Sequence, residues 1–224
     1  MVLSLDDEPW RPSPRLLNIC AQLAAVTPNI SHPLLDSRAA RAAEARWYKC
    51  FPGEHYHLLT ALASLLKPAI VWEFGTDTGM SAVALLEGLD QEATLYTVDI
   101  DSWKSKRVSW LIDADFSSRR VTQVVSDMKA PGLFSQYKDK IADAGLLFVD
   151  GPKDGFTEAA FLTLLGAIPF RRTPIVVFDD IRLMNMLQIW RGIQRHKMDM
   201  TSYGHWSGTG LVDWSPSKSS LRTN

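Results

Sequence analysis

The distribution of apolar residues changes at residue 69, where short apolar runs begin to alternate with longer segments of mixed polarity. These runs are continuous, which is typical of strands covered on both faces of a sheet. Strands are predicted at 69–75, 93–100, 121–125, 146–150, 174–179, 198–206 and 210–214, and helices at about 79–89, 106–116, 133–144, 155–168 and 184–195. Strand–helix alternation at this spacing predicts an α/β fold with a doubly wound, mostly parallel seven-stranded sheet.

The first 50 residues have a different pattern, with several prolines and few periodic positions before residue 33. We expect an irregular arm with a short helix near 16–25, then a helix from Asp36 to Tyr48 with Asp36 as its N-cap. A further helix is predicted from 54 to 66, before Pro68. We therefore divide the chain into an N-terminal arm with helices at 1–50, a main domain at 51–214 and a flexible tail at 215–224. The N-terminal helices could close over a site or pack on a second subunit, which leaves a homodimer open.

Composition narrows the class of partner. The 224 residues carry 24 Lys and Arg against 25 Asp and Glu, a formal net charge of -1, which disfavours nucleic acid and anionic membranes as partners. No stretch approaches the roughly 18 apolar residues that span a bilayer. Two cysteines, Cys20 and Cys50, are too few for a disulfide framework, and the N-terminus is acidic where a signal peptide would be basic. We expect a cytoplasmic protein that acts on a small molecule.

The loop after the first predicted strand suits a ligand. In an open α/β sheet, ligands bind outside the carboxyl ends of the strands, and glycines there permit a tight turn and close approach. Asp77 stands where a dinucleotide-binding motif has glycine, and its carboxylate would face a pyrophosphate badly. S-adenosylmethionine carries a sulfonium and no phosphate, so it tolerates this carboxylate; an ordinary strand-to-helix turn is the alternative. The loop residues that we expect to bind such a cofactor are Glu73, Gly75, Thr76, Gly79 and Ser81.

The next two strands also end in polar residues. Asp99 lies 20 residues beyond Gly79, where a carboxylate can accept both hydroxyls of a ribose, and Ile100 follows it. The third strand ends at Ser126, Asp127 and Met128, which could hold an adenine edge. Alternatively, the aspartate at the end of the second strand is a helix cap, and the residues at the end of the third strand form a plain turn.

Three aspartates follow the fourth and fifth strands, namely Asp150, Asp179 and Asp180. If these strands are neighbours, the carboxylates repel one another unless a cation or protons compensate. An all-oxygen set of ligands predicts a hard ion such as Mg²⁺, Mn²⁺ or Ca²⁺. Alternatively, Asp180 caps the next helix and Asp150 binds only the cofactor.

Together these motifs resemble the class I S-adenosylmethionine-dependent methyltransferases. More narrowly, the chain is similar to the small O-methyltransferases that depend on a divalent metal, such as catechol and caffeoyl-CoA O-methyltransferases. The loop from Glu73 to Ser81 matches the family's first motif, and Asp150-x-x-Lys153 matches the spacing of its metal ligand and general base. The pair Asp179-Asp180 stands where the family often has Asp-Asn, and is similar to metal-dependent O-methyltransferases of sugars and antibiotics.

The resemblance implies methyl transfer from S-adenosylmethionine to a hydroxyl of a phenolic, catechol-like, sugar or natural-product acceptor. Asp150, Asp179 and Asp180 would hold the metal, and Lys153 would take the proton once a neighbouring cation lowers its pKa. His205 is the second candidate for the base. We interpret His55 and His57 as surface or packing residues, because positions i and i+2 of a helix face different ways.

Three other functions remain compatible with the sequence. They are a dinucleotide-dependent oxidoreductase, a non-catalytic S-adenosylmethionine-binding protein, and a methyltransferase without a metal in which Asp179 and Asp180 only cap.

Overall fold

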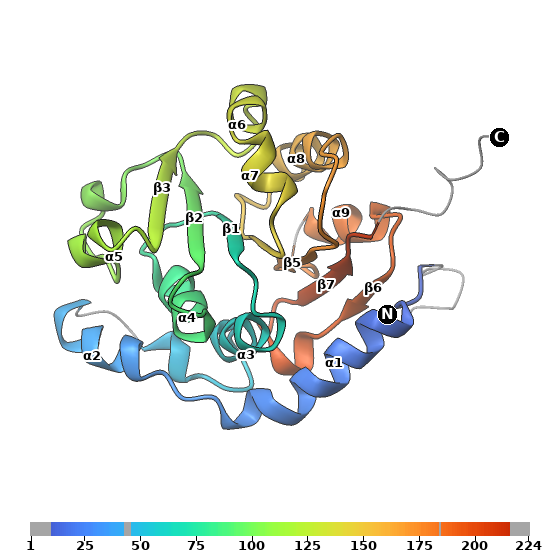
Figure 1. The fold of residues 1–224 in the computed structure, drawn as a ribbon. Helices are drawn as coiled ribbons and strands as arrows, with labels where there is room; N and C mark the ends of the chain where they lie inside the picture. The colour runs from blue at the N-terminus through green and yellow to red at the C-terminus, as the bar shows by residue number, and fades with distance from the viewer. Residues whose placement is uncertain (1–9, 43–45, 184, 216–224) are drawn as a thin grey trace.

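A computed structural model describes residues 10–42, 46–183 and 185–215. Its centre is a seven-stranded sheet in the order β3-β2-β1-β4-β5-β7-β6 (Figure 1). The strands are β1 (Ile70–Phe74), β2 (Thr94–Asp99), β3 (Val121–Val125), β4 (Leu146–Val149), β5 (Ile175–Asp179), β6 (Lys197–Asp199) and β7 (Thr209–Asp213). The doubly wound α/β fold that the pattern predicted is confirmed.

The pairing of the strands positions the site. β1, β2, β3, β4 and β5 are parallel, so their carboxyl ends share one edge of the sheet. β7 is antiparallel to β5 and pairs its first residue, Thr209, with Asp179. The loop before β7 therefore lies at the edge where β4 and β5 end, which brings residues 204–208 beside the predicted metal ligands.

Helices cover both faces of the sheet (Figure 1). One face is covered by α1 (Pro14–Val26), α2 (Pro33–Ala42), α3 (Tyr56–Leu66), α4 (Met80–Gly88) and α5 (Asp113–Ser117). The other is covered by α6 (Pro131–Gln136), α7 (Lys138–Ala142), α8 (Phe156–Gly166) and α9 (Met186–Gly192). Strand residues alternate between the two hydrophobic layers: Val71 joins the first, and Trp72 the second. Because both faces are covered, the central strand β4 is wholly apolar and β5 is apolar up to its last residue, Asp179.

The N-terminal helix α2 begins earlier than predicted, at Pro33. Asp36 is not its N-cap, because its carboxylate accepts a hydrogen bond from the Tyr48 hydroxyl at 2.8 Å. The first amides of α2 are instead bound by Glu87 of α4, whose carboxylate accepts from the backbone N of Leu34 and, at 3.1 Å, of Leu35. A cap contributed from 52 residues away leaves no local signal in the sequence.

Other predicted boundaries were also wrong. The helix predicted at 106–116 is a 3₁₀ turn (Trp103–Ser105) followed by α5, and the helix predicted at 133–144 is broken between α6 and α7. The strand predicted at 198–206 ends at Asp199, because the Asp199 carboxylate accepts from the Thr201 amide at 2.9 Å and its hydroxyl at 2.5 Å. A 3₁₀ turn (Thr201–Tyr203) follows, and two more lie at Thr27–Asn29 and Trp47–Lys49.

The N-terminal helices share the core of the main domain. Leu16, Leu23 and Leu35 are fully buried in the layer that also contains the apolar residues of α3 and α4. The boundary at residue 50, the homodimer and the role of these helices stay predictions, and residues 216–224 of the predicted tail lie outside the described residues. In the described part of the chain, no helix has the length and apolar character needed to cross a membrane.

Candidate active site

The turn that connects β1 to α4, residues 75–79, is called here the cofactor turn. It passes close to the end of β4: a Cβ at Gly75 would lie 2.1 Å from the carbonyl oxygen of Asp150, and the φ of Gly75 is +108°. Gly79 has φ +83°, and a Cβ there would lie 2.7 Å from the Leu111 side chain. Only glycine fits both positions. The glycines expected from the sequence thus bring backbone, rather than side chains, to the edge of the sheet.

Glu73 and Ser81 lie beneath the cofactor turn and not on its ligand side. The Glu73 carboxylate is fully buried and accepts hydrogen bonds from the hydroxyls of Ser81 at 2.6 Å and Thr97 at 2.5 Å. Burial raises the pKa of Glu73 to about 7. The Thr76 hydroxyl lies 2.6 Å from that of Thr97. These side chains join the turn to α4 and β2, so they shape the cofactor turn from below.

Asp99, at the end of β2, fixes the ligand side of the same turn. Its Oδ2 accepts from the backbone N of Thr76 at 3.0 Å and of Asp77 at 2.8 Å, and its Oδ1 accepts from the backbone N of Asp101 at 3.0 Å. Asp77 adopts left-handed backbone with φ 41°, which is unusual for a residue other than glycine. The carboxylate predicted to bind ribose is therefore held in place by amides.

A cavity of about 510 Å³ opens at these strand ends, within the usual range for small-molecule sites of ~300–1,000 Å³. Eight of the predicted site residues line it. The seven that do not are Glu73, Thr76, Gly79, Ser81, Asp179, Asp180 and His205. Ile100 is 70% exposed, so its apolar side chain is free to contact a flat ring. The predicted residues that line the cavity are Gly75, Asp99, Ile100, Ser126, Asp127, Met128, Asp150 and Lys153.

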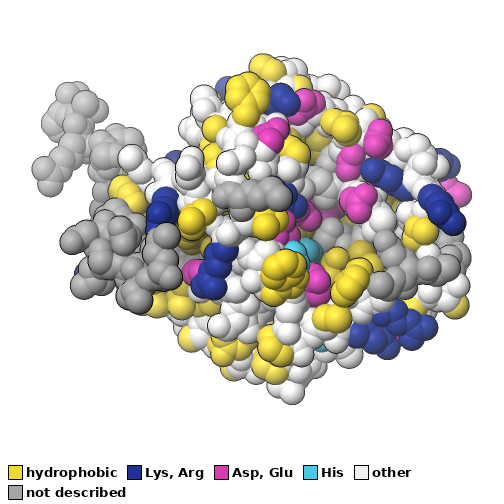
Figure 2. Space-filling view, turned by 180° about the vertical axis from the view of Figure 1, so that it is seen from behind, with side chains coloured by type: hydrophobic (Ala, Val, Ile, Leu, Met, Phe, Trp, Pro, Cys, Tyr) yellow, Lys and Arg dark blue, Asp and Glu magenta, His cyan; other side chains and the backbone are white. Residues whose placement is uncertain are grey.

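The charge of this cavity is mainly negative. Five aspartates and only two lysines line it, and Lys129 is already paired with Asp127 at 3.0 Å. Such a lining repels a pyrophosphate and attracts a cationic group, such as a sulfonium or an ammonium. Figure 2 shows acidic side chains gathered with a histidine near the middle of one face of the molecule, with hydrophobic side chains around them. The cavity therefore disfavours a dinucleotide.

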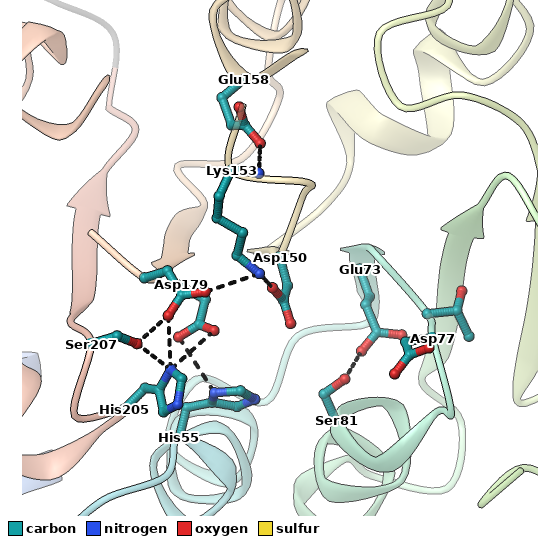
Figure 3. Close-up of polar contacts among 12 residues, drawn as sticks. His55, Glu73, Asp77, Ser81, Asp150, Lys153, Glu158, Asp179, His205 and Ser207 are labelled. Carbon is teal, nitrogen blue, oxygen red and sulfur yellow. Dashed lines mark hydrogen bonds and ion pairs between the residues drawn. The ribbon is translucent and has the colours of Figure 1, made fainter. Parts of the chain in front are cut away.

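Lys153 brings the predicted metal ligands together. Its Nζ contacts the Asp150 carboxylate and lies 3.0 Å from Oδ2 of Asp180. Its backbone N donates to Glu158 at 2.8 Å, which holds the loop after β4. Lys153 and Asp180 both have left-handed backbone, with φ 63° and 58°. In Figure 3 the Lys153 side chain extends from this loop toward the carboxylates, with His205 and His55 on their other side.

His205 reaches the same carboxylates from the loop before β7. Its Nδ1 lies 3.0 Å from Oδ1 of Asp180, 3.5 Å from Oδ2 of Asp179 and 2.6 Å from Oγ of Ser207. Ser207 also donates to Asp180. On its other side, Nε2 of His205 lies 3.4 Å from the Glu54 carboxylate. The position predicted for a second candidate base is thus in direct contact with the aspartates.

His55 was missed by the sequence reasoning. α3 begins at Tyr56, so His55 precedes the helix and the argument from helical spacing did not apply to it. Its side chain is buried, and its Nδ1 lies 3.4 Å from Oδ1 of Asp179. His57, by contrast, packs against His32 and Phe51. The group that meets at the ends of β4 and β5 is called here the acid–imidazole cluster: Glu54, His55, Asp150, Lys153, Asp179, Asp180, His205 and Ser207.

Opposite charges hold the cluster in an ionised state. Burial by itself would lower the pKa of His205, but hydrogen bonds to Asp179 and Asp180 raise it to about 10. Burial opposes the charged form of Lys153 as well, yet Asp150 and Asp180 raise its pKa above the usual value. Burial and the charge of Asp179 raise the pKa of Asp150. Lys153 and His205 are therefore cations in this arrangement. To act as a general base, Lys153 would need a lowered pKa instead.

Several buried atoms of the cluster fit a bound cation. Among the described residues, Oδ1 of Asp179 and both ring nitrogens of His55 are buried without a hydrogen-bond partner. An unpaired buried polar atom costs about 1–3 kcal/mol, so a cation that bound these atoms would offset a penalty already present. The carboxylates and imidazoles are suitable ligands for a divalent ion. The residues therefore fit a metal, although the sequence did not predict the two imidazoles.

The comparisons with known proteins agree with this geometry. Residues 72–181 match a family model described as a methyltransferase domain. No curated protein is similar enough in sequence to be matched. All solved structures named below are under 25% identical, so their likeness concerns the fold.

Three such structures illustrate it. An S-adenosylhomocysteine-bound methyltransferase from Podospora anserina is 16% identical, with a TM-score of 0.58, over 89% of this chain and 96% of that one. The O-methyltransferase from Bacillus cereus is 16% identical, with a TM-score of 0.52, over 86% and 96%. CalS11, a TDP-rhamnose 3'-O-methyltransferase of calicheamicin biosynthesis, is 16% identical, with a TM-score of 0.55, over 96% and 100%.

Residues 72–181 are therefore a methyltransferase domain, as the motifs predicted, and the chain has the fold of the methyltransferases named above.

Proposed function

We propose that this protein transfers the methyl group of S-adenosylmethionine to a hydroxyl of a small molecule, with a divalent metal held by the acid–imidazole cluster. The observation that carries the proposal is the adjacency of the two parts of the site. Gly75 of the cofactor turn approaches the backbone of Asp150, and the Asp150 side chain belongs to the cluster. A cofactor seated on the turn would therefore lie beside the metal ligands.

The cofactor would occupy the acidic cavity. S-adenosylmethionine supplies a methyl group on a positively charged sulfur, which suits a lining of five aspartates. Asp99 is placed to accept hydrogen bonds from the ribose hydroxyls, and Ile100 to pack on the adenine. Ser126, Asp127 and Met128 close the end of the cavity at β3. The methionine part would then extend along the turn toward Asp150.

The acceptor would enter beside His205. Trp206, the next residue, is 70% exposed, and its backbone N donates to the Gly53 carbonyl at 3.0 Å. A large, rigid ring at the mouth of a polar site favours an acceptor with an aromatic or sugar ring, which can pack on it. The structural neighbours that methylate oxygen, including the sugar O-methyltransferase CalS11, support a hydroxyl as the methyl acceptor.

Residues of the cluster would position the acceptor and remove its proton. A divalent cation supplies positive charge, which favours the deprotonated acceptor and lowers the pKa of neighbouring cationic side chains. Asp150, Asp179 and Asp180 would hold this cation. Lys153 would then take the proton at Nζ, and His205 is the alternative base. Orienting the acceptor oxygen toward the methyl group can by itself account for roughly 7–11 kcal/mol of the barrier.

Binding measurements test the proposal in two steps. First, S-adenosylhomocysteine should bind in isothermal titration, whereas NAD and NADP should not. A ligand at 100 times its Kd also raises the free energy of unfolding by about 2.7 kcal/mol, which thermal shift detects. Failure to bind S-adenosylhomocysteine would overturn the proposed cofactor.

Secondly, methyl transfer should be assayed against a panel of phenolic, catechol-like and glycosyl acceptors. Activity should be lost on chelation and restored by a divalent ion. Activity that survives complete chelation would overturn the proposed metal dependence but not the proposed methyl transfer. Methylation confined to nitrogen acceptors would overturn the proposal that the methyl acceptor is a hydroxyl.

A further inference from the structure

Every compact set of metal-ligating atoms in the cluster includes a histidine. Within residues 10–42, 46–183 and 185–215, three groups have ligand atoms within 4.8 Å of one another: Asp179, Asp180 and His205; His55, Asp150 and Asp179; and Glu54, His55 and His205. The three aspartates alone do not form such a group, because the Lys153 ammonium lies between Asp150 and Asp180. The ligand set therefore differs from the all-oxygen set that the sequence predicted.

The distances around His205 suit a shared ion. Nδ1 of His205 lies 3.0 Å from Oδ1 of Asp180 and 3.5 Å from Oδ2 of Asp179. Ligands bonded to one ion at about 2.1 Å stand about 3 Å apart in neighbouring octahedral positions. Asp179 and Asp180 follow each other at the end of β5, so the antiparallel return to β7 is what brings the imidazole to them.

His55 supplies an independent observation. Its side chain is 5% exposed, and neither ring nitrogen makes a hydrogen bond, although a buried imidazole usually has a partner for each nitrogen. Nδ1 is in ion-pair contact with Oδ1 of Asp179 at 3.4 Å, and that oxygen makes no hydrogen bond either. These buried atoms without hydrogen bonds, Nδ1 and Nε2 of His55 and Oδ1 of Asp179, are the kind that a cation would bind together.

We propose that the metal of this site is bound through imidazole nitrogen as well as carboxylate oxygen, by His205 with Asp179 and Asp180 and by His55 on the opposite side of Asp179. This inference rests on the proposed function, and it makes His205 a metal ligand in place of Asp150 and leaves Lys153 as the base. Imidazole suits Fe²⁺, Ni²⁺ and Zn²⁺, whereas Mg²⁺ and Ca²⁺ prefer oxygen. The resident ion is therefore a transition ion rather than a hard alkaline-earth ion.

Mn²⁺ can report its own ligands. Untagged protein, with no added cofactor, is loaded with Mn²⁺ and studied by pulsed electron paramagnetic resonance. A directly bonded imidazole gives a ¹⁴N coupling that hydrated Mn²⁺ and an all-carboxylate site lack. We expect this coupling in the wild-type protein. His205→Gln should weaken or remove it and raise the Kd for Mn²⁺ at least tenfold, with a smaller increase for His55→Gln.

His57→Gln is the matched control, because His57 is two residues from His55 and packs outside the cluster. Its coupling and Kd should stay within twofold of the wild type. Bound Mn²⁺ without a ¹⁴N coupling would overturn the inference and leave the metal-dependent function standing. Absence of any bound ion would overturn the inference and the proposed metal together, while S-adenosylhomocysteine titration on the same sample tests the cofactor separately. The wild-type spectrum decides the question even if a variant fails to fold.

Discussion

The cofactor turn and the acid–imidazole cluster lie at the same edge of the sheet but are assembled from very different stretches of chain. The turn is one short segment between β1 and α4, completed by Asp99 from the adjacent strand. The cluster joins the loop before α3, the ends of β4 and β5, and the loop before β7. His55 and His205, which meet with ring centroids 5.6 Å apart, are separated by most of the main domain in sequence.

This difference has a physical consequence. The turn depends on backbone conformation and on hydrogen bonds to the carboxylates of Glu73 and Asp99, so a substitution there should change folding and cofactor affinity. The cluster depends on the balance of charges among groups that only the tertiary fold brings together, so a substitution there should change the chemical step. The following predictions test this division, from the largest expected effect to the smallest.

Lys153→Ala should lower kcat by about 10²- to 10⁴-fold, the usual contribution of a general base, while the Kd for S-adenosylhomocysteine stays within threefold. Steady-state kinetics and isothermal titration measure the two effects. Lys153→Arg is the control, because guanidinium keeps the charge but cannot act as a base. Restoration of kcat by arginine would show that Lys153 supplies charge only.

Glu73→Gln should change how stability depends on pH. The pKa of Glu73 is raised by burial from its usual value near 4.5 to about 7, so the folded protein holds this proton more tightly than the unfolded chain. The resulting stabilisation is present below about pH 4.5 and is lost as the pH rises through about 7, by at most roughly 3 kcal/mol.

Urea unfolding of both proteins at pH 5, 6, 7 and 8 measures this. The wild-type free energy of unfolding should fall relative to that of the variant over this range. Parallel pH profiles would mean that Glu73 is ionised throughout, held by the hydroxyls of Ser81 and Thr97.

Asp99→Asn should raise the Kd for S-adenosylhomocysteine about tenfold, because the amide replaces one carboxylate oxygen with a donor where ribose hydroxyls and backbone amides both need an acceptor. Isothermal titration gives the value. Asp101→Asn is the matched control, since the Asp101 carboxylate is exposed and pairs with Lys106, at 3.4 Å. Equal increases in Kd for the two variants would mean that the loss of affinity comes from the change in net charge and not from the position of Asp99.

Glu87→Ala should lower the free energy of unfolding by about 1–2 kcal/mol, the range for removing a helix cap. Asp36→Ala should lower the free energy of unfolding by less, because Asp36 is half exposed and binds Tyr48 and Lys49 rather than the start of α2. Thermal or urea denaturation compares them. A larger loss for Asp36 would contradict the cap described for α2.

The sequence predicted one part of the site far better than the other. Gly75, Gly79 and Asp99 were recognisable because close backbone approach and a carboxylate at a strand end are local requirements. Glu73 and Ser81 were expected on the ligand side of the turn, but they lie beneath it. The sequence could not show this, because spacing does not say which side of a turn a side chain faces. His55 was missed for a related reason: a helix start shifted by two residues changed the direction of its side chain.

By itself, the sequence determined the alternation of strands and helices, the glycine turn and the acids at the strand ends, because each follows from the periodicity and conformational limits of neighbouring residues. Only the tertiary structure decided that Lys153 separates Asp150 from Asp180, that Glu87 caps α2, and that two imidazoles join the carboxylates. Those contacts depend on sheet order and on the antiparallel return through β7, which place residues distant in the chain within a few ångströms of one another.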